Sequence, residues 1–291
     1  MSLGAHLALG ATTVCRCWAV VRRDGAVFGF TDHDRDLAFE GIVFRAGTGL
    51  TAKALSQTTG LAVDNAEAVG ALSDASVTEA DLAAGRFDGA EVRAWAVNWA
   101  DVTARALEFR GTIGEVARSG GAFRAELRGL AEALGQPRGR VIQRPCSAVL
   151  GDAQCRVDLS AAGYRAERAV EAVEGGRLFR WDDFGGFDDR WFEKGRLTVL
   201  TGAAAGLVGV VKGDQLSAAG RVVELWDGLR APVEPGDAVR LEAGCDKRAE
   251  TCRLKFLNFL NFRGFPHVPG EDWLTAYPVS SGRNDGGSLT G

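Results

Sequence analysis

The amino-acid sequence predicts a mainly β protein, with antiparallel strands in a barrel-like or sandwich-like arrangement and a few short helices. Short segments of alternating polar and apolar residues recur along the chain, and turn-forming dipeptides separate several of them. The 39 glycines suit a fold with many tight turns. With 291 residues, the chain is long enough for two ordinary domains or one large β-rich domain.

Two β-hairpins are predicted near the N-terminus. The first covers residues 17–31 and turns at Asp24-Gly25. The second covers residues 36–46 and turns at Glu40-Gly41. An acidic residue followed by glycine favours the tight turns that join antiparallel strands.

A short helix is expected next, because Thr78 and Asp81 have the spacing of a capping box and Gly85 can end the helix. A strand is then predicted over residues 91–99. Apolar residues occupy both of its faces, so we expect it to be buried on both sides or to lie at an interface.

Further strands are expected on both sides of Gly120-Gly121, followed by a short helix over residues 127–134. Short β segments then return in the second half of the chain. They cover residues 166–173, 197–200, 206–212, 222–226 and 238–242.

Residues 248–262 lack glycine and proline and are densely apolar, which predicts a helix near the C-terminus that is buried nearly all round. We divide the chain into an N-terminal β-rich domain over residues 1–140 and a C-terminal β-rich domain over residues 141–277. Residues 278–291 are rich in glycine, serine and asparagine and predict a flexible tail.

The charge pattern limits the classes of partner. The formal net charge is −4, and the charges are interspersed without a basic stripe that could contact phosphates. We therefore expect no sequence-specific nucleic-acid binding. No apolar run is long enough for a membrane anchor, and the N-terminus lacks the basic start of a secretory signal. We therefore expect a protein made in the cytoplasm, where cysteines are thiols or metal ligands rather than disulfides.

Four of the six cysteines form two pairs. Eight residues separate Cys146 from Cys155, six separate Cys245 from Cys252, and the pairs are about 90 positions apart. Turn-forming residues surround each pair, which predicts two loops that offer two sulfurs each. Zinc knuckles hold paired cysteines closer together, whereas the larger body of an iron–sulfur cluster accepts more widely separated thiolates. The spacing alone leaves zinc, and four unrelated buried cysteines, as alternatives.

Three further residue groups are catalytic candidates. Cys15 and Cys17 point to the same face of a predicted strand, and we interpret them as core residues. Asp32-His33-Asp34 is interpreted as a hydrogen-bonded turn at the end of a strand. Cys15 with His33 is a conceivable cysteine-protease pair, but the local signatures of such enzymes are missing. We therefore predict no catalytic residues and no enzyme.

Several motifs resemble the tail hub proteins of gene transfer agents and related prophages. The resemblance covers nearly the whole chain up to about Tyr277. The matching runs are Cys15-Arg16-Cys17-Trp18, Gly29-Phe30-Thr31-Asp32-His33-Asp34, Arg144-Pro145-Cys146, Leu150-Gly151-Asp152, Cys245-Asp246-Lys247, Thr251-Cys252 and Asn261-Phe262-Arg263-Gly264-Phe265-Pro266-His267. The cysteine pattern is also similar to that of the minor tail protein L of lambda-like siphophages, which holds a [4Fe–4S] cluster.

This resemblance implies that Cys146, Cys155, Cys245 and Cys252 are the ligands of a [4Fe–4S] cluster, with zinc as the weaker alternative. It further implies a structural protein at the tail tip, present as a homotrimer, between the distal tail protein and a larger baseplate or tail-fibre-like protein. Our hypothesis is that the cluster is a structural staple, and a redox role is the alternative.

A metal- or cysteine-dependent cell-wall hydrolase is the alternative function. Four cysteines saturate a cluster, whereas hydrolysis needs an open position on the metal.

Overall fold

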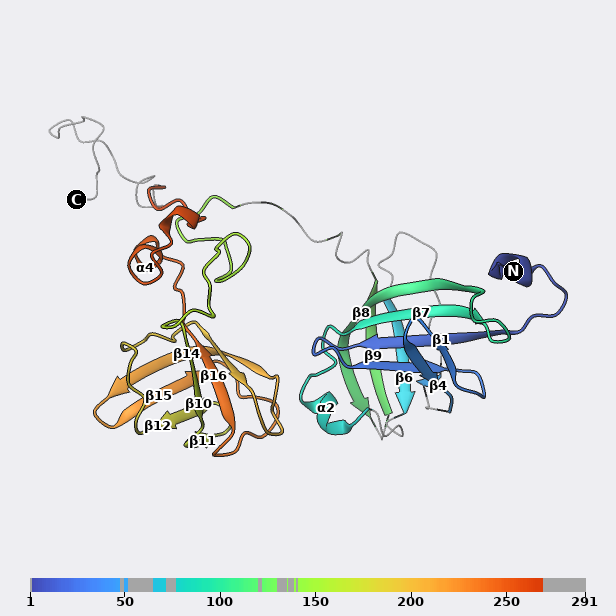
Figure 1. The fold of residues 1–291 in the computed structure, drawn as a ribbon, viewed down its shortest axis with the longest axis horizontal. Helices are drawn as coiled ribbons and strands as arrows, with labels where there is room; N and C mark the ends of the chain where they lie inside the picture. Colours follow the sequence, from blue (N-terminus) through green and yellow to red (C-terminus); the bar gives the residue numbers. More distant parts are fainter. Residues whose placement is uncertain are drawn as a thin grey trace. The chain divides into compact units, whose positions relative to one another are not determined.

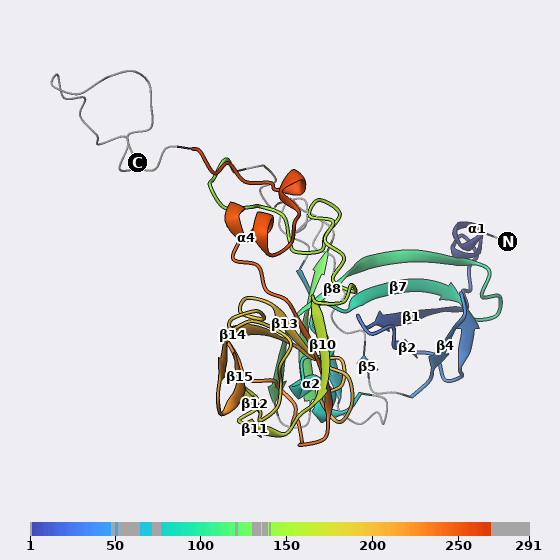
Figure 2. The same ribbon diagram turned by 60° about the vertical axis from the view of Figure 1, so that its left-hand side comes forward.

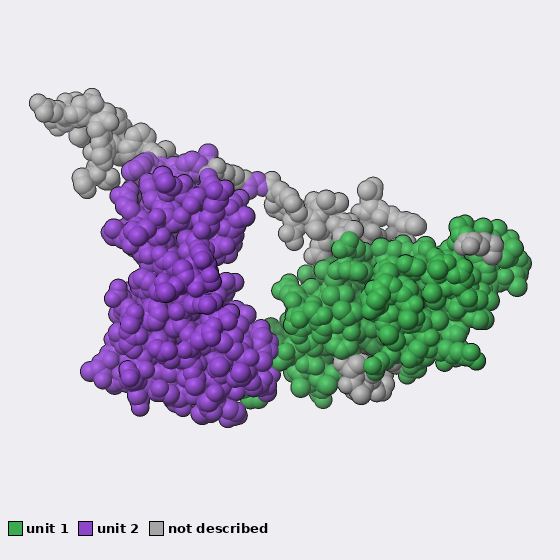
Figure 3. Space-filling model, viewed as in Figure 1, with its two compact units in different colours: residues 1–138, 229–233 green, residues 139–228, 234–291 purple. Residues whose placement is uncertain are grey.

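Antiparallel strands dominate the structure, a computed structural model, and this confirms the predicted mainly β class. Figure 3 shows the two compact units of the chain: residues 1–138 with 229–233, and residues 139–228 with 234–291. The described residues are 2–47, 50–51, 65–71, 77–119, 122–129, 135, 139 and 141–268.

Nine of the described strands form the sheet of the first unit, in the order β3-β4-β2-β1-β7-β8-β9-β6-β5 (Figure 1). All neighbours pair antiparallel except β2 and β4, which are parallel. The strands are β1 (Val14–Val21), β2 (Val27–Thr31), β3 (Leu37–Phe39), β4 (Ile42–Arg45), β5 (Leu50–Thr51), β6 (Asn65–Ala71), β7 (Glu91–Asn98), β8 (Arg105–Ser119) and β9 (Ala122–Gly129).

Both predicted hairpins are confirmed as β1–β2 and β3–β4. Helix α1 (Leu3–Leu7) precedes them, and helix α2 (Glu79–Ala83) has the predicted cap. The hydroxyl of Thr78 accepts the Asp81 N–H at 3.1 Å, and Gly85 follows the helix with a φ of +71°.

Strand β7 is buried on both faces, as predicted. Trp95 and Val97 belong to one core cluster of the first unit, and Val92 and Ala94 belong to another. Trp95 of this strand is only 3% exposed, so it is a core residue and does not face a partner. Tertiary packing explains this, because aromatic rings from β3 and β4 lie edge-on against the Trp95 ring.

Seven described strands form the sheet of the second unit, in the order β10-β16-β13-β14-β15-β12-β11. Its neighbouring strands are antiparallel throughout. The strands are β10 (Arg165–Ala169), β11 (Ala172–Glu174), β12 (Leu178–Trp181), β13 (Arg196–Val199), β14 (Val208–Ser217), β15 (Gly220–Leu225) and β16 (Ala238–Glu242).

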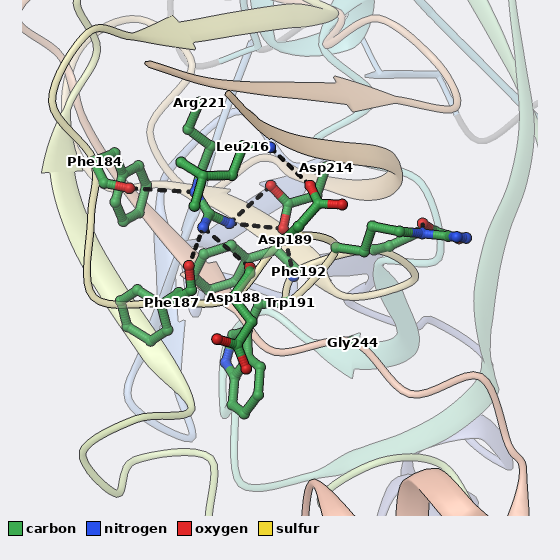
Figure 4. A network of polar contacts seen from close by, with 12 residues as sticks. Phe184, Phe187, Asp188, Asp189, Trp191, Phe192, Asp214, Leu216, Arg221 and Gly244 are labelled. Atoms are coloured by element: carbon green, nitrogen blue, oxygen red, sulfur yellow. Dashed lines mark hydrogen bonds and ion pairs between the residues drawn. The ribbon is translucent and has the colours of Figure 1, made fainter. Parts of the chain in front are cut away.

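A buried ion pair joins β14 and β15 to the loop before β13 (Figure 4). Arg221 donates from Nη1 to both carboxylate oxygens of Asp214 at 2.8 Å, and both side chains are fully buried. Its Nη2 donates to the carbonyls of Phe187 and Asp188. Burial raises the pKa of Asp214, although the Phe192 N–H and Arg221 both oppose that rise. The pair therefore fixes this loop on the sheet.

The predicted helix over residues 127–134 is wrong at its start. Leu127 lies in β9, opposite Ile113 of β8, because strand pairing there outweighs local helix propensity. Residues 130–134 lie outside the described residues, as does the predicted tail over residues 278–291.

The predicted buried helix over residues 248–262 is also wrong. Helix α4 (Ala249–Leu254) spans only six residues, and a short 3₁₀ helix, η1 (Phe259–Asn261), follows it. Leu257 between them has a left-handed φ of +47°, which ends the helical path. Phe256 is buried, whereas Leu257 is 84% exposed and Leu260 is 97% exposed.

Candidate metal centre

The four predicted ligand cysteines lie in one part of the second unit. Cys146 and Cys155 are in the loop before β10, Cys245 follows β16, and Cys252 is in α4. Figures 1 and 2 both show the yellow-green segment before β10 beside the red segment around α4. Cys155 and Phe256 belong to one small core cluster, with Cys146 and Cys245 packed against it.

Hydrogen bonds between the two cysteine loops hold them together. The Cys146 N–H donates to the carbonyl of Lys247 at 2.9 Å, and the Lys247 ammonium donates to the carbonyl of Ala148. The hydroxyl of Tyr164 donates to the carbonyl of Lys255 at 3.3 Å. These bonds connect residues far apart in the sequence, so they place the two pairs of sulfurs together.

Asp152 shapes the loop that carries the first cysteine pair. Its carboxylate accepts three backbone N–H groups, from Cys155 (2.6 Å), Val149 (2.9 Å) and Gln154 (2.9 Å). These donors, that of Cys155 above all, lower the pKa of Asp152. The Asp152 carboxylate therefore fixes the backbone of residues 149–155, the part of the loop that ends at Cys155.

A C-terminal arm, residues 262–268, runs alongside Cys146. The Arg263 N–H donates to the Cys146 sulfur at 3.3 Å, and the Ser147 hydroxyl donates to the Arg263 carbonyl at 3.1 Å. A Cβ on Gly264 would lie 2.5 Å from the carbonyl oxygen of Arg144. Glycine is thus required for the arm to approach the loop this closely.

Three of the four sulfurs accept an N–H hydrogen bond from within the described residues. The pairs are Arg263 N to Cys146 Sγ (3.3 Å), Lys247 N to Cys245 Sγ (3.4 Å) and Asn258 Nδ2 to Cys155 Sγ (3.7 Å). Donors of this kind stabilise metal-bound thiolates and tune the potentials of iron–sulfur clusters.

The thiols are close enough for their charges to interact. Burial raises the pKa of Cys245. Burial, and then the charges of Cys245, Cys146 and Cys155, raise the pKa of Cys252 to about 11. Four thiolates in one place therefore repel one another unless cations offset their charge, as iron or zinc does.

Lys255 supplies positive charge beside the site. Its ammonium donates to the carbonyls of Trp191 and Gly244 and lies 4.4 Å from the centre of the Trp191 ring. Burial lowers the pKa of Lys255, and the negative charge of Cys245 opposes that shift. Trp191 is in the loop fixed by Arg221, so the buried ion pair supports the site indirectly.

The donor set is four thiols, which are ligands for zinc and for iron–sulfur clusters alike. Among the described residues, no three His, Cys, Asp or Glu side chains are grouped closely enough to hold one ion.

A cavity of about 670 Å³ opens beside Cys146, lined also by Gln143, Gln154 and Arg263. The buried Nε of Arg263 has no hydrogen-bond partner among the described residues. Cys146 is the one of the four cysteines that lines this cavity.

The other sequence candidates lie in the first unit, apart from the four cysteines. Asp32 accepts the Arg16 N–H at 2.7 Å, and the His33 ring accepts the Arg35 N–H at 3.0 Å. This is the hydrogen-bonded turn that the sequence predicts. Cys15 is buried in the core, where the Thr31 hydroxyl contacts it.

Sequence reasoning missed Asn258, Arg263 and Lys255 as members of the site. The sequence signals were their place in the same C-terminal segment as Cys252 and, for Arg263, the matching run over residues 261–267. No described helix is long and apolar enough to cross a membrane.

Comparison with known proteins agrees with the resemblance. Residues 1–158 match the family described as baseplate hub protein, N-terminal attachment domain. Residues 190–272 match the family described as phage conserved hypothetical protein BR0599. A chain of a solved structure, the virion of a native gene transfer agent particle, is 61% identical, with a TM-score of 0.90 and 99% of each chain covered. No curated protein matches. The chain therefore belongs to the baseplate hub protein family, a family of structural proteins of phage-like particles.

Proposed function

We propose that the chain is the tail-tip hub of a phage-like particle of the gene transfer agent or siphophage type. In this role a ring of three copies joins the distal tail protein to the larger baseplate protein. The baseplate hub match and the 61% identity to a chain of a gene transfer agent virion support this proposal. The protein is made in the cytoplasm and acts at the tail tip, and we assign it no catalytic activity.

Exposed apolar side chains next to the cysteine site support a role in assembly. Leu254 is 68% exposed, Leu257 is 84% exposed and Leu260 is 97% exposed, all within one short segment. Scattered apolar residues are normal on a surface, but several in one segment usually mark a partner site.

Replacing Leu257 and Leu260 together by aspartate is expected to reduce the number of complete tails strongly, because charge opposes burial in an interface. Electron microscopy of particles would count complete tails and locate the hub. In wild-type particles we expect it at the far end of the tail only, with symmetry divisible by three. Val208→Asp, at a 53% exposed position of β14, is the matched control. Normal tails in the double variant would exclude this segment as an assembly surface.

We also propose that Cys146, Cys155, Cys245 and Cys252 hold a [4Fe–4S] cluster as a structural staple. The observation that carries this proposal is that two segments far apart in the sequence bring the four cysteines into one region. Three of the four sulfurs accept an N–H hydrogen bond there. Iron–thiolate bonds would cross-link the loop before β10 to α4, and such links restrict the unfolded chain.

Protein purified without oxygen is expected to be brown, with broad absorbance near ~400 nm and about four irons per chain. Thiolate-to-iron charge transfer causes this colour. Ultraviolet–visible spectra and metal analysis test the expectation together. A colourless protein that holds one tightly bound zinc would exclude the cluster and leave the zinc alternative.

A further inference from the structure

Asn258 contacts two cysteines that belong to different pairs. Its side-chain Nδ2 donates to the Cys155 carbonyl at 2.6 Å and lies 3.7 Å from the Cys155 sulfur. Its own carbonyl accepts the S–H of Cys252 at 3.4 Å. Asn258 thus lies between the loop before β10 and helix α4.

The amide orientation of Asn258 is fixed by a third contact. Asn261 donates from Nδ2 to the Asn258 Oδ1 at 2.7 Å, which turns the Asn258 NH₂ group toward Cys155. The Asn258 backbone N–H donates to the Cys252 carbonyl at 2.9 Å. That bond does not involve the thiol, so it persists when metal binding removes the Cys252 proton.

Backbone geometry does not explain why position 258 is an asparagine. Asparagine often occupies left-handed positions, but here the left-handed residue is Leu257, with a φ of +47°. Asn258 has an ordinary φ of −122°, and any residue could make its backbone bond to Cys252. Only the side chain reaches Cys155, so the amide itself distinguishes asparagine from other residues at this position.

We propose that Asn258 is the positioning residue of the cluster site: it locks Cys155 against Cys252 and donates an N–H to the Cys155 thiolate. This inference rests on the proposed cluster. An N–H donor withdraws electron density from a bound thiolate, so it favours the reduced cluster and slows loss of iron.

Two substitutions test the proposal in the full-length protein. Asn258→Ala removes the donor, and Asn258→Asp keeps the size but directs a carboxylate at the thiolate. We expect a chelator to release iron about 10-fold faster from both variants than from the wild type. We also expect a more negative reduction potential in Asn258→Ala, a change that loose packing alone would not produce. Leu260→Ala, a 97% exposed position in the same segment, should match the wild type in its rate of iron release and in its reduction potential.

Wild-type protein gives a second measurement, which does not depend on how the variants fold. Pulsed electron paramagnetic resonance of the reduced cluster, with ¹⁵N-labelled asparagine, should detect one asparagine nitrogen coupled to the iron spins. Iron-loaded protein without this coupling would overturn the inference about Asn258 but not the proposed cluster. Variants that match the wild type in iron-release rate and reduction potential would do the same. A wild type that holds no iron would overturn the proposed cluster and this inference with it.

Discussion

Replacing Cys146 or Cys252 by serine is expected to remove nearly all of the bound iron, from about four atoms per chain to well below one. A serine hydroxyl is a poor substitute for a thiolate, so each variant is left with three of the four proposed cysteine ligands. The loop before β10 should then separate more easily from α4. Iron analysis and limited proteolysis of the second unit measure both effects.

Cys15→Ser is the matched control for these variants. Cys15 is as buried as Cys155, but it lies in β1 of the first unit, within a core cluster that includes Trp95. Its substitution should leave the iron content unchanged. Equal iron loss in the Cys15 and Cys146 variants would show that the ligands are wrongly assigned.

Arg221→Met is expected to reduce the free energy of unfolding of the second unit by about 3–5 kcal/mol. The substitution leaves the Asp214 carboxylate buried without its cation, and it removes the donors to the carbonyls of Phe187 and Asp188. Urea denaturation followed by tryptophan fluorescence measures the change, because Trp181 and Trp191 both lie in this unit.

The double variant Arg221→Met with Asp214→Leu should recover much of this loss, because two apolar side chains can replace a buried pair. Arg240→Met is the control for loss of an arginine. Arg240 forms a partly exposed pair with Glu167 at 2.8 Å, and such pairs contribute less than about 1 kcal/mol. A single Arg221 variant as stable as the Arg240 variant would contradict a structural role for the buried pair.

The sequence predicts the hairpins and the cap of α2 because their signals are local. Asp24-Gly25 and Glu40-Gly41 set their turns through residues next to them in the chain, and Thr78 caps a helix that starts at the next residue. The failed helix over residues 248–262 had strong apolar content, but the chain leaves the helical path at Leu257, next to Asn258. That residue bonds to Cys155, 103 positions earlier, and no window of sequence contains such a contact.

The sequence predicts only part of the candidate site. The spacing left four unrelated cysteines as an alternative, and the resemblance implied that Cys146 and Cys252 belong to one site. The structure places the two segments that carry them close together. The donors to the sulfurs remained hidden, because backbone N–H groups such as that of Arg263 carry no residue-specific signal. Arg221 and Asp214 were also missed, since charged residues on adjacent strands ordinarily lie at the surface.

The C-terminal arm has a consequence for the order of events during synthesis. Its bonds reach back 116 residues from Arg263 to Ser147 and 124 residues from Val268 to Arg144. Domains fold as they leave the ribosome, so the first unit and the loop with Cys146 emerge long before the arm. The loop that carries Cys146 is therefore complete before α4 and the arm, because strands β10 to β16 are synthesised in between. The second cysteine pair, Cys245 and Cys252, is made only shortly before the arm, so the proposed cluster would gain its last ligands near the end of synthesis.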